Sequence, residues 1–187
     1  MAFSVILGLW TSSNVKFTQR PKTKDPKPQM TTESFQVQNP SFASEIRASF
    51  AKQSVMELIG AKLSRIEPGI VEITVPYRND LTQQHGYLHA GVVTTIADSA
   101  CGYAAYSLMP AGSEVLSVEF KVNLLRPAKG NDFLARAEVI KPGKTLTVVR
   151  ADVFGLSGDE SQRILIASML GTMFCISNAV AASHRES

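Results

Sequence analysis

The sequence predicts an α+β domain in which one long buried helix lies against a long, curved antiparallel sheet of five to six strands. The helix is indicated by a run of about twenty mostly small and apolar residues, His89 to Leu108, which is closed by Met109-Pro110-Ala111-Gly112. Four segments of alternating apolar and polar residues follow it, as in half-buried strands. Short turn-like links join these segments, which favours antiparallel pairing because parallel pairs need long crossovers.

The N-terminal segment differs in composition from the rest of the chain. Residues 1–29 begin with the apolar stretch MAFSVILGLW and then become basic and proline-rich. Their net charge is +4, whereas that of the whole chain is +3. We therefore expect residues 1–39 to be a disordered or targeting-like extension, 40–178 the folded domain and 179–187 a flexible tail. The apolar stretch is too short to span a bilayer, and an organelle transit peptide or a start at Met30 remain alternatives.

The predicted elements of the domain follow in order. Apolar residues at helical spacing in 41–59 predict one or two short helices. The stretch AKLSRIEPGIVEITVPY alternates on both sides of Pro68-Gly69, which predicts a strand hairpin. Beyond the long helix we expect the strands SEVLSVEFKVNLLRP, NDFLARAEVIK, KTLTVVRADVFG and QRILIASMLGTMFCI, arranged as a meander of sequential neighbours.

Asp98 is the single carboxylate within the long helix. Small or apolar residues cover nearly every face of that helix, so we expect it to be buried on all sides. A charged side chain in such surroundings is costly without a partner. Asp98 is therefore a candidate for chemistry as well as for a structural ion pair or hydrogen bond.

The start of the helix offers a second chemical feature. Its first amides, near Ala90 and Gly91, lack intrahelical acceptors and carry the positive end of the helix dipole, which suits a polarised carbonyl or an oxyanion. His89 lies nine residues before Asp98, about 13 Å along the helix, so one carbonyl cannot contact both. If both serve one reaction, a second copy of the helix must run antiparallel to the first, in a twofold dimer with shared sites.

Three segments together carry a family resemblance. QQHGYLHAGVVTTIADS, SVEFKVNLLRPAKG and VIKPGKTLTVVRADVF resemble the hotdog-fold acyl-CoA thioesterases of the phenylacetic-acid-degradation (PaaI-like) type, from about Gly60 to Ile176. The resemblance implies a hotdog fold that pairs as a homodimer and then as a dimer of dimers. It further implies hydrolysis of an aromatic or medium/long-chain acyl-CoA to the free acid and CoA, with no cofactor. We expect a cytoplasmic location, with import into an organelle through residues 1–29 left open.

The resemblance also implies roles for particular residues. Asp98 matches the carboxylate that acts as general base or nucleophile. His89 and the Ala90 amide match the pair that positions and polarises the thioester carbonyl, and Ser117 matches a hydroxyl that orients water. Two positions depart from the family pattern: the common HGG is HAG here, and Gln83 stands where Asn is frequent.

A further set of residues matches segments that border the substrate and its coenzyme A. Their cations suit phosphate groups, although they are equally suited to solvated turns. The set consists of Gly91, Arg126, Pro127, Lys129, Lys141, Gly143, Lys144 and Thr145.

Other functions fit the sequence less well. A non-catalytic acyl-CoA-binding module is the main alternative, and the presence of Asp98 counts against it. A hotdog hydratase would carry His five residues after the helix Asp, where Tyr103 stands. Outside the N-terminal segment the chain has a net charge of −1, which does not favour nucleic-acid binding. Cys101 and Cys175 show no metal-ligand spacing, and no metal is expected.

Overall fold

The computed structural model describes residues 35–158 and 163–176. The predicted tail 179–187 and most of the predicted extension 1–39 lie outside the described residues. The elements are α1 (Phe42–Phe50), α2 (Ser54–Ile59), β1 (Lys62–Glu67), β2 (Ile70–Pro76), the short 3-10 helix η1 (Asn79–Leu81), α3 (Ala90–Tyr106), β3 (Glu114–Leu124), β4 (Asp132–Lys141), β5 (Leu146–Leu156) and β6 (Arg163–Ile176).

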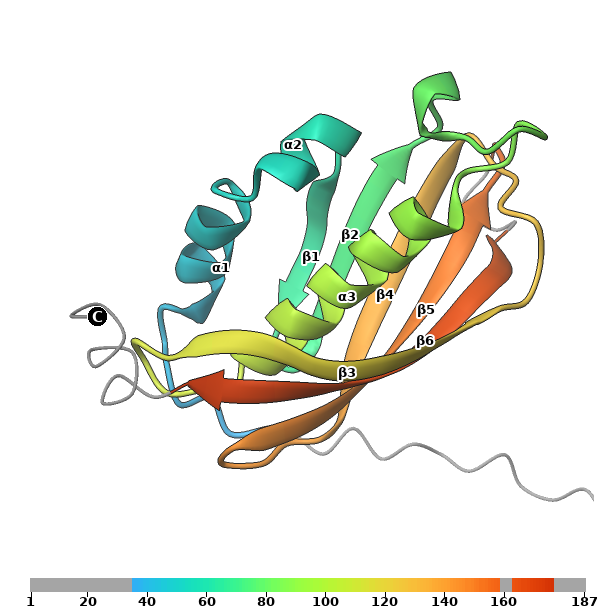
Figure 1. Cartoon of the computed structure of the whole chain (residues 1–187). Coiled ribbons are helices and arrows are strands. Elements are labelled where there is room, and N and C mark those ends of the chain that lie inside the picture. The colour runs from blue at the N-terminus through green and yellow to red at the C-terminus, as the bar shows by residue number, and fades with distance from the viewer. Residues whose placement is uncertain (1–34, 159–162, 177–187) are drawn as a thin grey trace, which may run out of the picture. The chain divides into compact units, whose positions relative to one another are not determined.

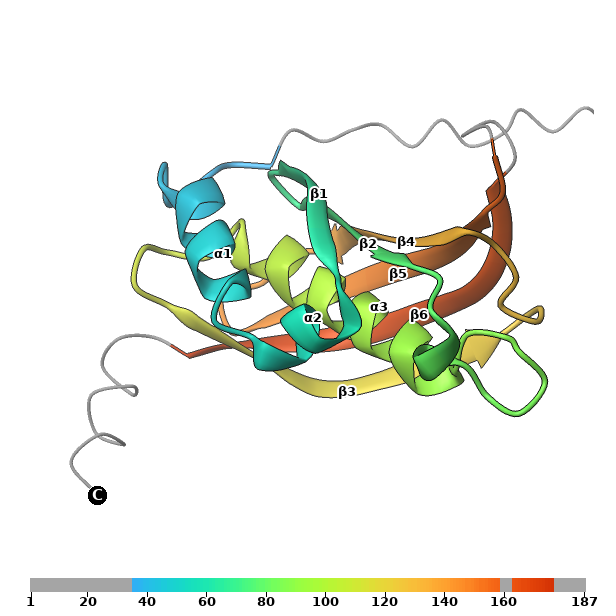
Figure 2. The same cartoon turned by 90° about the horizontal axis from the view of Figure 1, so that it is seen from above.

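The strands form one antiparallel sheet that curves around α3 (Figure 1, Figure 2). The helix contacts β2, β3, β4, β5 and β6, so it lies along the concave face. Helix α1 lies beside α3, and the rings of Phe50 and Tyr103 meet with their centroids 6.1 Å apart. The predicted α+β architecture is confirmed.

The place of β3 in the sheet differs from the predicted meander. The strand order is β1-β2-β4-β5-β6-β3, so β3 pairs with β6 and forms one edge. The link of residues 125–131 must therefore pass β5 and β6 before β4 begins. Seven extended residues reach about 23 Å, more than the roughly 14 Å of three strand spacings. The short link therefore predicts that β3 and β4 run in opposite directions, but it does not predict which strand pairs with β3.

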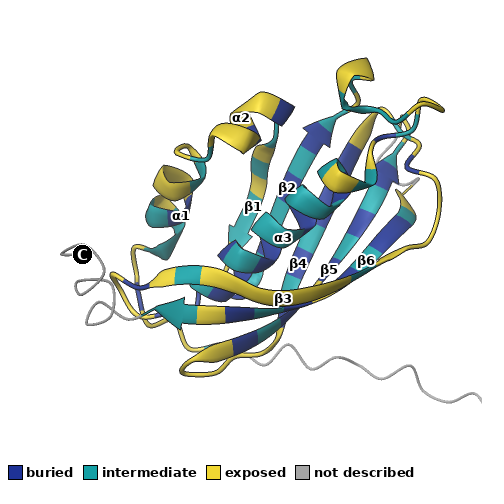
Figure 3. Cartoon of the chain, in the orientation of Figure 1, coloured by how far each residue is buried: buried dark blue, intermediate teal, exposed yellow. Residues whose placement is uncertain are grey.

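The core lies between the concave face and α3 (Figure 3). Strand β2 shows the alternation that this requires, with Val71, Ile73 and Val75 fully buried. Phe133 of β4 is the largest side chain among those that are fully buried.

Within one chain the helix α3 is not buried on all sides, so the predicted burial all round would need a second copy. Ile96, Ala97 and Ala100 are fully buried against the sheet. On other sides Gly91 is exposed and Asp98 is partly exposed. The apolar sequence therefore marks a helix that the sheet covers on one side and leaves partly open on another.

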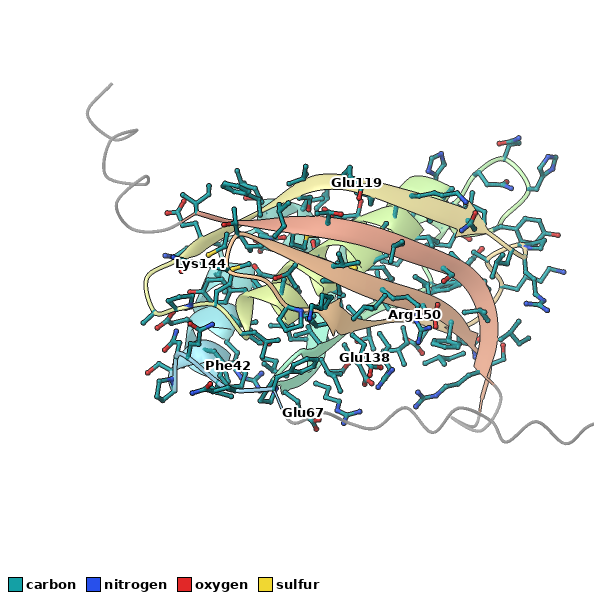
Figure 4. The ribbon with its side chains drawn as sticks, turned by 90° about the horizontal axis from the view of Figure 1, so that it is seen from below. Phe42, Glu67, Glu119, Glu138, Lys144 and Arg150 are labelled. Carbon is teal, nitrogen blue, oxygen red and sulfur yellow. The ribbon has the colours of Figure 1, made fainter. Side chains whose placement is uncertain are left out.

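The convex face of the sheet carries charges that alternate in sign across neighbouring strands. Arg136 contacts Glu72 at 3.4 Å and Glu138 at 2.9 Å, and Arg150 contacts Asp152 at 3.8 Å. Figure 4 shows Glu138 and Arg150 on this face, seen from below. Such partly exposed pairs contribute little stability individually.

Candidate active site

The start of α3 is fixed by the loop that precedes it. The His89 amide donates to the Leu81 carbonyl at 2.9 Å, and the Leu88 amide donates to the Ala128 carbonyl at 3.2 Å. His89 has φ −63° and ψ 137°, the extended backbone of an N-cap residue. Its side-chain Nδ1 accepts a hydrogen bond from the Gly91 amide at 2.9 Å.

This cap decides which amide stays free. Because His89 Nδ1 is an acceptor, the neutral imidazole carries its proton on Nε2. The Gly91 amide is occupied by the cap, whereas the Ala90 amide has no acceptor within the described part of the chain. Ala90 therefore provides the N–H that can serve an outside oxygen, at the positive end of the helix dipole.

A cavity of about 460 Å³ opens beside this amide. The cavity is bounded by the loop before α3, the first turns of α3 and the link after β3. Its lining residues are Gln83, Tyr87, Leu88, Ala90, Val93, Leu124, Leu125, Arg126, Pro127, Ala128 and Ile166. Most of these side chains are apolar, and Gln83 and Arg126 supply polar groups, as is usual in small-molecule sites.

The polar residues at this cavity are held by local contacts. The side-chain carbonyl of Gln83 accepts a hydrogen bond from the His85 amide. Arg126 Nη1 donates to the Leu165 carbonyl at 2.8 Å, and Lys129 Nζ lies 5.2 Å from the centre of the Tyr87 ring. The Lys129 contact has cation–π geometry, which keeps a positive charge near the cavity wall.

Asp98 lies at a second, separate cavity of about 500 Å³. Ser117 of β3 donates its hydroxyl proton to Asp98 Oδ1 at 2.6 Å, the short distance of a charge-assisted bond. The other carboxylate oxygen, Oδ2, accepts no hydrogen bond from the described residues. One oxygen is thus held by Ser117, and the other is left without a hydrogen bond from the described residues.

Cys101, which lies near Asp98 on α3, is not a reactive nucleophile. It lies one helical turn further on and is fully buried. Burial, and to a lesser extent the Asp98 carboxylate, raises the pKa of the Cys101 thiol. The thiol therefore stays protonated and unreactive.

Six of the predicted site residues line the first two cavities. Gln83, Ala90, Arg126 and Pro127 line the first cavity, whereas Asp98 and Ser117 line the second. The two cavities share no lining residue. Ala90 and Asp98 are eight residues apart on one helix, about 12 Å along its axis.

The predicted coenzyme A residues do not come together in one chain. Arg126, Pro127 and Lys129 precede β4, whereas Lys141, Gly143, Lys144 and Thr145 lie in the β4–β5 hairpin at its far end. The ten residues of β4 span about 33 Å. No phosphate can contact both groups of a single chain. Gly143 and Lys144 instead line a third cavity, of about 310 Å³, near the end of α3.

The sequence did not predict the wall that α1 and the turn after it add to the second cavity. Ser49 and Gln53 lie about fifty positions before Asp98, and they line its cavity together with Tyr103. No local spacing signals a contact over that separation. Gly102 lies four residues after Asp98 and therefore on the same helix face. A glycine at this position indicates from the sequence that this face is open.

Among the described residues, no cluster of three or more His, Cys, Asp or Glu side chains could hold a metal ion. In the same part of the chain, no helix has the length and apolar character needed to cross a membrane.

Residues 85–161 match the model of the Thioesterase superfamily. A relative named "Putative esterase" in Saccharolobus solfataricus is 32% identical over 129 residues, which cover 69% of this chain and 82% of that protein. Acyl-coenzyme A thioesterase 13 of Pongo abelii is 28% identical over 112 residues, covering 58% of this chain and 79% of that protein.

Solved structures extend the comparison to the fold. A thioesterase family protein from Silicibacter pomeroyi superposes with a TM-score of 0.69 and 50% identity, covering 72% of this chain and 98% of that chain. The E. coli PaaI protein from the phenylacetic acid degradation operon superposes with a TM-score of 0.64 at 20% identity. The superposition covers 73% of this chain and 94% of that chain. With the long helix α3 lying in a curved antiparallel sheet, the chain belongs to the thioesterase superfamily and is a hotdog-fold thioester hydrolase.

Proposed function

We propose that the protein hydrolyses the thioester of an acyl-CoA to a free carboxylic acid and CoA. The observation that carries this proposal is the pair of prepared groups on α3: an Ala90 amide with no acceptor in the described structure, and an Asp98 carboxylate held by Ser117. An oxyanion donor and a positioned carboxylate are what acyl transfer to water requires.

The two groups serve one reaction in a dimer. They lie about 12 Å apart along one helix, too far to act on one carbonyl. An antiparallel second copy of α3 would bring its Ala90 to the Asp98 of the first, with the twofold axis close to Thr94, midway between them.

The edge strand β3 supports this pairing. It is eleven residues long, pairs with β6 on one side, and exposes the large side chains Leu116, Val118 and Phe120. A long apolar edge of this kind is a template for pairing with another strand. Antiparallel pairing of two β3 edges would join the sheets and cover the open side of each α3.

The reaction follows from these positions. The thioester oxygen accepts a hydrogen bond from the Ala90 amide of one copy, at the positive helix end, and His89 fixes that end by occupying the neighbouring amide. Asp98 of the other copy either takes a proton from water as the water oxygen attacks the carbonyl carbon, or attacks that carbon itself. When Asp98 acts as a base, the carbon–sulfur bond then breaks and the leaving CoA thiolate takes the proton that Asp98 accepted. When Asp98 attacks, the bond breaks as an anhydride forms between Asp98 and the acyl group; water then hydrolyses this anhydride to the free acid, restores the carboxylate and supplies the proton for the CoA thiolate. Ser117 keeps Asp98 oriented in both cases.

The cations that flank the first cavity suit the phosphates of coenzyme A. Arg126 lines this cavity together with Ala90, and Lys129 lies over the ring of Tyr87, another lining residue. The hairpin lysines Lys141 and Lys144 reach the same coenzyme A from another chain, which fits a dimer of dimers. The charges that alternate across the convex sheet face are complementary to a copy of themselves and support such a second contact.

The test is an acyl-CoA panel with aromatic, short, medium and long acyl groups, read out as released thiol. We expect turnover by the wild type and loss of at least 100-fold in kcat for Asp98→Asn and Asp98→Ala, both folded and dimeric. Near-full turnover by both variants would overturn the role of Asp98. Tight acyl-CoA binding without any turnover would instead favour the binding-module alternative.

A further inference from the structure

The cavity at Asp98 is a groove that continues along α3. Its floor is the stripe of Asp98, Gly102 and Tyr106, each one helical turn from the next, about 12 Å in all. One wall is Ser49 of α1 together with Gln53 in the turn between α1 and α2, and the other is residues 113–117 at the start of β3. The groove therefore begins at the reacting carboxylate and leads away from it.

Gly102 keeps this groove open. Glycine in the interior of a helix is less stable than alanine. A Cβ added at Gly102 would meet no atom within 4 Å, so packing does not require a glycine there. The missing side chain leaves free space above the floor of the groove.

A chain of hydrogen bonds runs along the α1 wall. Gln53 Nε2 donates to the Tyr103 hydroxyl at 2.8 Å, and Tyr103 donates to Ser49 Oγ at 3.1 Å. The Tyr103 side chain is buried, with 4% of its surface exposed, whereas Ser49 is exposed. The proton of the Ser49 hydroxyl has no acceptor in the described part of the chain. The relay Gln53–Tyr103–Ser49 thus ends in a donor that faces the groove.

The ionisable groups around the groove are acidic or neutral. Asp98 lies at one end and Glu114 lines the β3 wall, while Glu45 accepts a bond of 2.6 Å from the Tyr106 hydroxyl at the far end. Among the residues that the structure describes, no Lys or Arg lines this cavity. A second carboxylate on a bound acyl group would therefore be repelled, whereas a neutral hydrogen-bond acceptor would be accepted.

We propose that this groove holds the acyl group, and that the relay selects acyl groups with a neutral hydrogen-bonding substituent. The inference rests on the proposed thioesterase function. The Ser49 hydroxyl lies 3.1 Å from the hydroxyl of Tyr103, which stands five residues beyond Asp98, about 7.5 Å along the helix. An extended chain advances about 1.2 Å per bond, so the substituent lies roughly six bonds from the thioester carbon. The matching substrate class is a six-carbon hydroxyacyl-CoA.

The test compares three substrates of equal chain length: hexanoyl-CoA, 6-hydroxyhexanoyl-CoA and adipoyl-CoA. We expect kcat/KM for the hydroxylated substrate to exceed that for hexanoyl-CoA about three- to tenfold, the effect of one net hydrogen bond. Adipoyl-CoA, with its terminal carboxylate, should be the poorest of the three. In Tyr103→Phe and Ser49→Ala the hydroxyl preference should fall to near one. Ser44→Ala, on the same helix but outside the groove, is the matched control and should keep the wild-type ratio.

The Gly102 position gives an independent test. Gly102→Leu should lower kcat/KM for hexanoyl-CoA about tenfold relative to acetyl-CoA because the leucine fills the groove, and Gly102→Ala should lower it less. Circular dichroism checks that each variant is folded. Hydrolysis without a hydroxyl preference, or a preference kept in both relay variants, would overturn the inference while leaving the thioesterase function intact. If no acyl-CoA is hydrolysed, the proposed function fails and the inference with it.

Discussion

Replacing Ala90 by proline removes the proposed oxyanion donor with little other change. Ala90 is the first residue of α3, where proline is favoured because its fixed φ suits the helix. His89 already has the extended backbone that a residue before proline prefers. The Ala90 amide bonds to no acceptor in the described structure, so the substitution breaks no hydrogen bond found there. We therefore expect the folded state to lose less than about 1 kcal/mol.

The catalytic effect should be much larger. Loss of one oxyanion-hole donor lowers kcat about 100- to 1000-fold, or roughly 3 to 4 kcal/mol in the transition state. The assay is steady-state thiol release from a saturating acyl-CoA, with thermal unfolding and sedimentation of the same samples. Ala90→Val, which has a similar volume and keeps the amide, should stay at least tenfold more active than Ala90→Pro. A folded, dimeric Ala90→Pro enzyme with kcat within threefold of the wild type would refute the assignment.

Three further changes test other parts of the structure. Ser117→Ala removes the 2.6 Å bond to Asp98 and should lower kcat about tenfold without changing the melting temperature; an unchanged kcat would mean that Ser117 does not position the carboxylate. Val118→Asp places a charge on the β3 edge, where Val118 is 57% exposed, and should give inactive monomers in sedimentation experiments. Val55→Asp, at 44% exposure on α2, should stay dimeric and active, and a dimeric Val118→Asp would contradict the β3 pairing. Phe133→Ala empties a fully buried position and should cost about 3 to 5 kcal/mol in urea unfolding, whereas a loss below 1 kcal/mol would mean that the core refills.

Most of the fold could be predicted from the sequence because its elements are long and strongly patterned. The run from Ala90 to Tyr106 is too long and too rich in alanine for a strand, and the β2 alternation matches its burial residue by residue. The position of β3 could not be predicted, because a seven-residue link reaches both the next strand and one three spacings away. Neighbour choice depends on how the whole sheet curves around the helix.

The candidate site was predictable in part. Ala90 and Asp98 stand in one short motif, and the geometry of a single helix was enough to separate them into different cavities. The role of the His89 side chain as a cap for the Gly91 amide depends on its rotamer, which a sequence does not fix. The wall formed by Ser49 of α1 and Gln53 in the turn after it arises from packing over long sequence distances, so it is visible only in the structure.

The 12 Å between Ala90 and Asp98 has a genetic consequence. If each site takes Ala90 from one chain and Asp98 from the other, two inactive variants can form an active site when they pair. In a mixed dimer of Asp98→Asn and Ala90→Pro chains, one site receives both defects and the other receives none. Random reassociation of equal amounts should thus restore about a quarter of the wild-type sites. Two harmful alleles of such a gene would complement each other within one cell. Such complementation is not possible when each active site is formed by one chain alone.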